Sequence, residues 1–186
     1  MKRSLKSIVT GSLSVLALSA ALAAGSSGTA VAQDDFYKGK TMRILIGFPP
    51  GGSYDLYGQV ISLYWGKKIP GEPNVIVEHR PGGGGRTAAS YFFSKAPTDG
   101  TVIGSLPETI ATLQLLEPKR VRWDLRTARF IGSIVPAHSV FGVRSDSGVK
   151  NAQDALTKPY KVGCTAKASS SAQVPLLIKN LVGAKF

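Results

Sequence analysis

Residues 42–58 read MRILIGFPPGGSYDLYG, and this stretch decides how the fold begins. The apolar run at 41–48 is short and ends at two prolines, which predicts a buried strand. Ser53 is a suitable N-cap and Asp55 a suitable first-turn acid for a helix that follows at once. Apolar residues at helical spacing supply its packing side: Leu56, Val60, Leu63 and Tyr64.

The same strand–loop–helix pattern continues along the chain. Strands are expected at 75–77 and 101–106, and a helix follows each of them. The second of these helices is expected at 109–116. The packing side of the first is formed by Ala88, Ala89, Phe92, Phe93 and Ala96. Further strands are expected at 130–135, 140–144 and 160–164, with helical segments at 151–156 and 173–182 and Gly183 as the last helix's stop. Such alternation predicts an α/β fold with a mostly parallel sheet and right-handed crossovers.

The N-terminal segment reads as an export signal. Lys2, Arg3 and Lys6 precede an uncharged apolar stretch at 8–24, and Ala30-Val31-Ala32 fits a cleavage motif, so the expected mature chain starts at Gln33. The alternative is a membrane anchor, but glycines and serines make this stretch a poor span.

The chain carries 23 basic and 11 acidic residues, a formal net charge of +12. The excess suits an anionic ligand, or serves solubility alone. Export and the dispersed basic residues argue against nucleic acid. Cys164 is the single cysteine, so an intramolecular disulfide is excluded, and its place at the end of an apolar strand predicts a small core residue. The two histidines, His79 and His138, have no metal-site spacing, and no metal or cofactor is expected.

Loops rich in Gly, Ser and Pro follow predicted strands at 49–53, 81–86 and 165–171, and are called the first, second and third loops. In a parallel sheet such loops gather at the carboxyl edge. A glycine lets a ligand approach the backbone, and a helix start offers unpaired N–H groups, so a carboxylate or phosphate site is indicated. For the first loop, a plain strand-to-helix turn explains the residues equally well. Nucleotide binding is disfavoured because GGGGRT lacks the Lys-Ser/Thr of a Walker A loop.

A serine hydrolase is the alternative from another class. It would use Ser53, Ser105 or a serine at 169–171, with His79 or His138 as base. No G-x-S-x-G motif is present, and His79 is better interpreted as a hydrogen-bonded histidine at a strand end.

The order FPPGGSYD, EHRPGGGGR, APTDGTVIG and YKVGCTAKASSS resembles the periplasmic substrate-binding proteins of tripartite tricarboxylate transporters, the Bug family. The resemblance covers nearly all of residues 33–186. It implies a type II periplasmic-binding-protein fold, in which two α/β lobes close on a small carboxylate. It also implies a periplasmic, non-catalytic monomer that passes its ligand to integral-membrane subunits. A sensory or accessory binding protein on this fold is the alternative.

The resemblance divides the chain into a first lobe at 33–138 and a crossover with the start of a second lobe at 139–186. Family members are longer, so the second lobe is expected to be incomplete and the chain a fragment or a truncated reading frame. The apolar faces of Val162, Leu177, Ile178 and Leu181 are then expected to lack cover. Departures from the family pattern include His79 in place of Asn and Arg86 in place of a neutral polar residue.

The expected ligand-binding residues come from all three loops and one strand end. They are Pro50, Gly51, Gly52, Ser53 and Asp55; Gly84, Gly85, Arg86 and Thr87; Ser105; and Thr165, Ser169 and Ser170. Arg86 either meets a second ligand carboxylate or is solvated surface. Asp55 either orients the first loop through backbone N–H groups, meets a ligand hydroxyl or ammonium, or is a plain first-turn acid.

Overall fold

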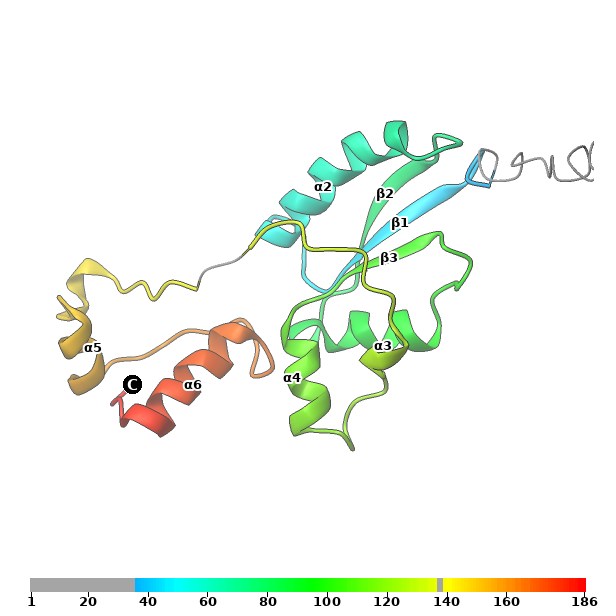
Figure 1. The fold of residues 1–186 in the computed structure, drawn as a ribbon. Helices are drawn as coiled ribbons and strands as arrows, with labels where there is room; N and C mark the ends of the chain where they lie inside the picture. Colours follow the sequence, from blue (N-terminus) through cyan, green and yellow to red (C-terminus); the bar gives the residue numbers. More distant parts are fainter. Residues whose placement is uncertain (1–35, 137–138) are drawn as a thin grey trace, which may run out of the picture.

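The computed structural model describes residues 36–136 and 139–186, so the expected signal segment lies outside the described residues. Strands and helices alternate in the first part: β1 (Thr41–Ile46), α2 (Ser53–Trp65), β2 (Asn74–His79), α3 (Arg86–Ser94), β3 (Val102–Ser105) and α4 (Thr109–Leu116). Two helices follow, α5 (Ala152–Thr157) and α6 (Ser170–Val182) (Figure 1). Single 3₁₀ turns lie at Gly66–Lys68, Gly83–Gly85, Leu125–Thr127 and Ser145–Ser147. The predicted α/β class is confirmed.

The three strands form one parallel sheet in the order β2-β1-β3. Central β1 is covered on both faces, and Met42, Ile44, Leu45 and Ile46 are buried, which explains its nearly continuous apolar sequence. The register places Ile46 opposite both His79 and Ser105. The strands therefore end level, and the loops that follow them start from one edge of the sheet.

Helix α2 lies on one side of the sheet, with α3 and α4 on the other (Figure 1). Its predicted packing side is wrong: Leu56, Val60, Leu63 and Tyr64 are all exposed. The buried residue is Gly58 on the opposite side, where an added Cβ would lie 2.6 Å from Ile46 Cδ1. The missing side chain decides which face meets the sheet, because it lets the helix backbone come close. The helix also takes Gly52, not Ser53, as N-cap.

A second cluster of buried residues joins α3 and α4 to the third loop. Ala89, Ile110, Leu113, Trp123 and Ala168 pack together, and Trp123 Nε1 donates to the Ile110 carbonyl at 3.2 Å. Ala168 thereby anchors the third loop to the body of the sheet domain.

The strands predicted at 130–135, 140–144 and 160–164 are wrong: the described residues of these segments form none. Phe130 and Val140 are 81% and 91% exposed. A strand needs a neighbour for its backbone hydrogen bonds, and none of the three described strands pairs with these segments. Cys164 is exposed, so its predicted core position is also wrong.

The last helices agree better with the sequence. Helix α5 begins after Asn151, whose side chain accepts from Asp154 N at 2.9 Å. Helix α6 starts earlier than predicted, at Ser170, and ends at Gly183 as expected, with φ 76°. Leu177 and Leu181 are exposed, as predicted, whereas Val162 and Ile178 are half-buried. Over the described ranges, no helix is both long and apolar enough to cross a bilayer.

Replacing Gly58 with valine should destabilise the fold. The new side chain would meet Ile46 Cδ1 at 2.6 Å and Val77 Cγ2 at 3.3 Å from its Cβ alone, and such overpacking costs about 1–3 kcal/mol. Urea unfolding measures the loss. Gly132→Ala is the control, since nothing lies within 4 Å of a Cβ there. Equal stability of the two variants would show that α2 does not approach the sheet this closely.

Candidate ligand-binding site

The first loop is fastened by Asp55 and His79. Asp55 Oδ2 accepts from Gly51 N at 2.9 Å, and its Oδ1 lies 3.0 Å from His79 Nε2. His79 Nδ1 donates to the Phe48 carbonyl at 2.9 Å. Of the interpretations of Asp55, the one in which it orients the loop through a backbone N–H is therefore confirmed, and so is a strand-end His79 with hydrogen-bond partners.

The pKa of Asp55 lies below its ordinary value, chiefly because the Gly51 N–H bonds the carboxylate. Partial desolvation opposes this effect, and the Gln59 amide and His79 add to it. The charge of Asp55 is thus directed to protein donors. The Gly51 N–H is engaged by the protein as well, which removes it from the amides that a ligand can reach in this conformation.

The second loop is built from four glycines with positive φ: Gly82 at 138°, Gly83 at 57°, Gly84 at 64° and Gly85 at 94°. A Cβ on Gly85 would lie 2.4 Å from Pro107 Cγ, and one on Gly84 would lie 2.9 Å from Ser169 N. A Cβ on Gly47, just before the first loop, would lie 2.9 Å from Gly85 Cα. The strand-end loops therefore do converge, through backbone contacts that side chains would prevent.

This packing changes the interpretation of the glycines. Protein atoms fill the space beside Gly84 and Gly85, which are buried. In contrast, nothing lies within 4 Å of a Cβ on Gly51 or Gly52. Open space beside glycines is therefore found at the first loop. The N–H groups in the first turn of α2 lie next to it, and no preceding turn of helix supplies carbonyl oxygens for them.

In the third loop, three hydroxyls bond one another. Ser169 Oγ lies 3.0 Å from Thr165 Oγ1 and 2.7 Å from Ser171 Oγ, and donates to the Ala166 carbonyl at 2.7 Å. Ser169 is buried. Thr165 and Ser169 therefore shape this loop from within. Ser170 instead lines a hollow of about 590 Å³, together with segments 139–144 and 160–163, and neither of the first two loops lines it.

Arg86 is paired within the protein. Its Nη2 lies 2.7 Å from Glu117 Oε2, which Arg120 approaches at 3.4 Å. The pKa of Glu117 is lowered, chiefly by its hydrogen bond from Arg86. The structure thus places Arg86 between α3 and the end of α4, so the interpretation of it as solvated surface is wrong. Thr87 sits beneath the second loop, where a Cβ on Gly82 would meet its Oγ1 at 2.5 Å.

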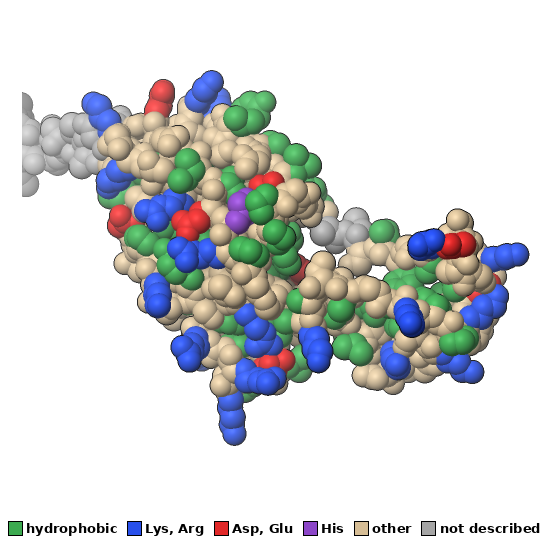
Figure 2. Space-filling model, turned by 180° about the vertical axis from the view of Figure 1, so that it is seen from behind, with side chains coloured by type: hydrophobic (Ala, Val, Ile, Leu, Met, Phe, Trp, Pro, Cys, Tyr) green, Lys and Arg blue, Asp and Glu red, His purple; other side chains and the backbone are tan. Residues whose placement is uncertain are grey.

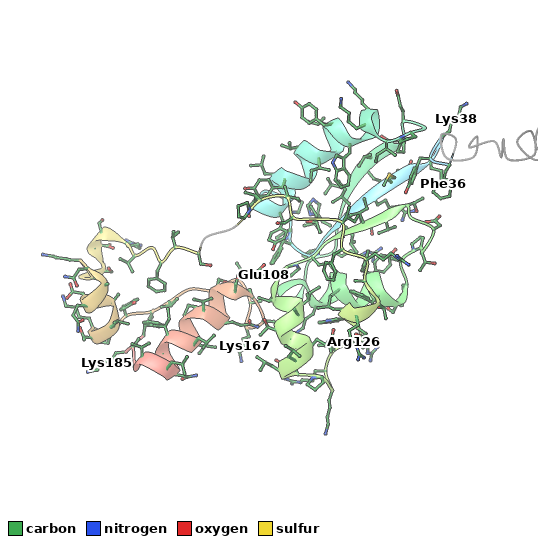
Figure 3. The ribbon with its side chains drawn as sticks, in the orientation of Figure 1. Phe36, Lys38, Glu108, Arg126, Lys167 and Lys185 are labelled. Atoms are coloured by element: carbon green, nitrogen blue, oxygen red, sulfur yellow. The ribbon has the colours of Figure 1, made fainter. Side chains whose placement is uncertain are left out.

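The structure adds residues that the sequence reasoning missed. Tyr54 donates to Glu108 Oε2 at 3.0 Å, joining the first turn of α2 to the start of α4 (Figure 3). Burial raises the pKa of Tyr54, and the charge of Glu108 adds to this. Thr109 is 4% exposed, and its Oγ1 is the buried side-chain polar atom that lacks a partner among the described residues. The sequence did carry a signal for Glu108 and Thr109. Residues 106–108 form another strand-to-helix connection at the same edge of the sheet, between Ser105 and the start of α4.

Comparison with known proteins gives similarity over part of the chain. The chain is 31% identical over 126 residues to a UPF0065 protein in the gbd 5′ region of Cupriavidus necator, and this match covers 67% of the chain and 37% of that protein. It is 34% identical over 83 residues to a UPF0065 protein in the tcbD-tcbE intergenic region of Pseudomonas sp. (strain P51), covering 45% of this chain and 24% of that one.

The chain resembles UPF0065 proteins. The matches span 37% and 24% of the lengths of these two curated relatives. No protein-family model matches the chain, and no solved structure does. The relatives' names state no ligand, so the chemistry of the site has to be argued from its geometry.

Two glycines with nearly equal φ provide a matched test of the convergence. Gly51 has φ 92° and open space, whereas Gly85 has φ 94° and Pro107 against it. Alanine is strained at either position, but only Gly85→Ala adds a steric overlap, so we expect it to be less stable than Gly51→Ala by about 1–3 kcal/mol. Urea unfolding of both variants measures this difference. Equal losses would mean that the second loop and Pro107 are not in contact.

Proposed function

We propose that this chain is part of an exported solute-binding protein that captures a small organic carboxylate for a tripartite tricarboxylate transporter. The similarity to UPF0065 proteins supports the receptor family, to which the Bug proteins belong. The observation that carries the ligand class is the open first loop. At Gly51 and Gly52 the backbone is accessible, next to the start of a 13-residue helix.

The first turn of α2 offers N–H groups and the positive end of a helix dipole. A carboxylate at this point would accept hydrogen bonds from the backbone near Gly52 and Ser53, with Pro50 limiting the motion of the loop. Asp55 opposes an anion less than its position in the sequence suggests, because Gly51, Gln59 and His79 surround its oxygens. The basic excess of the chain favours the same ligand class.

The other expected residues take different roles in this proposal. Gly85 supports the first loop by packing against Gly47, and Gly84 packs against the third loop. Thr87 lies beside Gly82, and Ser105 pairs with Ile46 at the end of β1. Thr165, Ser169 and Ser170 belong to the segment at 139–186, which we assign to a second lobe that would close on the ligand. Arg86 would select a second carboxylate only by leaving Glu117.

The proposal places the protein in the periplasm, as a monomer that passes ligand to integral-membrane subunits. A sensory or accessory role on the same fold is the second candidate. A serine hydrolase is less well supported, because both ring nitrogens of His79 already face acceptors, the Phe48 carbonyl and Asp55. His79 is thus not free to serve as a base for Ser53. His138 lies outside the described residues.

A substitution at the N-cap separates ligand binding from folding. Gly52→Asp should keep or raise stability by a few tenths of a kcal/mol, since Asp is a preferred N-cap. Its carboxylate would occupy the N–H groups that we assign to the ligand. We therefore expect the affinity for acetate, succinate or citrate, whichever the wild type binds in calorimetry, to fall about tenfold or more.

Gly52→Asn is the matched control, because it caps the helix without the charge. It should bind more tightly than Gly52→Asp. If both variants bind as the wild type does, the first turn of α2 is not the site. If the wild type binds no carboxylate of the panel, the ligand class is wrong.

Thr109 gives an independent test. Its buried hydroxyl lacks a partner in the described structure, and such a group costs about 1–3 kcal/mol. Thr109→Val should therefore be as stable as the wild type or more so in urea unfolding. Thr109→Ser, which keeps the hydroxyl, is the control. A loss of stability in Thr109→Val but not in Thr109→Ser would show that the hydroxyl is bonded within the protein.

A further inference from the structure

We propose that His79 is a positioning residue that holds the first loop in its doubly protonated form, so that carboxylate capture weakens as pH rises. The part concerning the loop stands on the contacts of His79 alone. The part concerning capture rests on the proposed function.

The argument starts from the two neighbours of the imidazole ring. Nδ1 lies 2.9 Å from the Phe48 carbonyl oxygen, which can only accept a hydrogen bond. Nε2 lies 3.0 Å from Asp55 Oδ1, which is an acceptor while the carboxylate is ionised. A neutral imidazole has a single N–H and donates to one of them. Only the imidazolium donates to both.

The charges around the ring favour this form. Asp55 reaches it from α2, and the pKa of that carboxyl is lowered, chiefly by Gly51 N–H and in smaller part by His79. The neighbours of His79 on β2 point elsewhere, since side chains alternate along a strand. Glu78 pairs with Arg80 at 2.6 Å and lies 3.7 Å from Arg43 of β1. Arg80 itself stacks over Tyr91 of α3, on the far side of the sheet.

The ring links two ends of the first loop. His79 contacts the Phe48 carbonyl and Asp55, and Asp55 accepts from Gly51 N. Residue 48 is thereby connected to residue 51 through two side chains, one from β2 and one from α2. If the imidazole loses one proton, either the Phe48 contact is lost or a nitrogen lone pair faces the Asp55 carboxylate. In both cases the loop loosens next to Gly52, and a positive charge near the ligand disappears.

The two titrations act in opposite directions. The contribution of His79 is present while both ring nitrogens carry protons and is lost when the ring releases one of them. The contribution of Asp55 is present above the ordinary aspartate range and lost as pH falls through its lowered pKa. The His79 side chain is 17% exposed, so protons have access to it. Lysine and arginine side chains are spread over the face of the molecule shown in Figure 2.

The first experiment needs no ligand. Nitrogen-15 NMR of the imidazole rings reports how many ring nitrogens are protonated, and His138→Asn removes the second histidine signal. In that background we expect both His79 nitrogens to be protonated at pH 6, together with a slowly exchanging Gly51 amide that loses protection toward pH 8. Adding Asp55→Asn removes the carboxylate that faces Nε2 and bonds Gly51, and should weaken the protection of the Gly51 amide. A ring with one protonated nitrogen at pH 6, or Gly51 protection that ignores pH, would overturn the role of His79.

The second experiment measures succinate binding between pH 5.5 and 8. The wild type should lose about three- to tenfold in affinity over this range, the equivalent of one weakened charge-assisted contact. His79→Asn should show a flat profile, because it does not titrate. Parallel profiles for the two proteins would overturn the effect on capture. If neither protein binds succinate at any pH, the ligand assignment fails, and the NMR result alone decides the role of His79.

Discussion

The close contact between Gly47 and Gly85 is the constraint on which the site depends. A Cβ on Gly47 would come within 2.9 Å of Gly85 Cα, and one on Gly85 would come within 2.4 Å of Pro107. The contact is possible because β1 is the central strand and its neighbours end level with it. Three successive strand-to-helix connections are thereby stacked, with backbone against backbone at Gly47 and Gly85 and with the Pro107 ring against Gly85. Their packing fixes where α2, α3 and α4 begin, and so where their N–H groups point.

Glycines with the same backbone conformation serve two purposes here. Gly51 and Gly85 share a φ near 93°, yet one faces open space and the other faces a proline ring. A glycine-rich loop in a sequence therefore indicates close approach without saying what approaches. At the second loop it is the protein itself. The open glycines at the first loop are consequently the ones that a ligand could reach in the proposed site, whereas the longer run at 82–85 is packed against the protein.

The sequence predicted well those elements that have local signals and a partner nearby. The alternation up to residue 116 was read correctly, because each strand there pairs with a neighbour and each helix follows directly. The apolar runs at 130–135 and 140–144 had the same local signal but no adjacent strand in the described structure, and they remain irregular. On α2 the periodicity indicated the wrong face, since Gly58 contributes nothing to a hydrophobic pattern.

The site was predictable to a similar extent. Loop convergence and the role of Asp55 followed from strand order and helix-start chemistry, which are local or topological. The pairs Arg86–Glu117 and Tyr54–Glu108 join residues 31 and 54 positions apart. No spacing rule within one helix or loop reaches so far, so these pairs and the isolated hydroxyl of Thr109 needed the three-dimensional structure.

A carboxylate beside the proposed anion site is the feature that most needs a physical explanation. Like charges repel, so Asp55 would weaken ligand binding if its charge were exposed toward the ligand. Its three donors come from different parts of the fold: Gly51 from the loop, Gln59 from one turn along α2, and His79 from β2. The negative charge thus ties the loop to the strand next to it, and a ligand at the proposed site would meet backbone dipoles instead. Because His79 is held in turn by the Phe48 carbonyl, the Asp55 carboxylate, the first loop and β2 form one hydrogen-bonded unit.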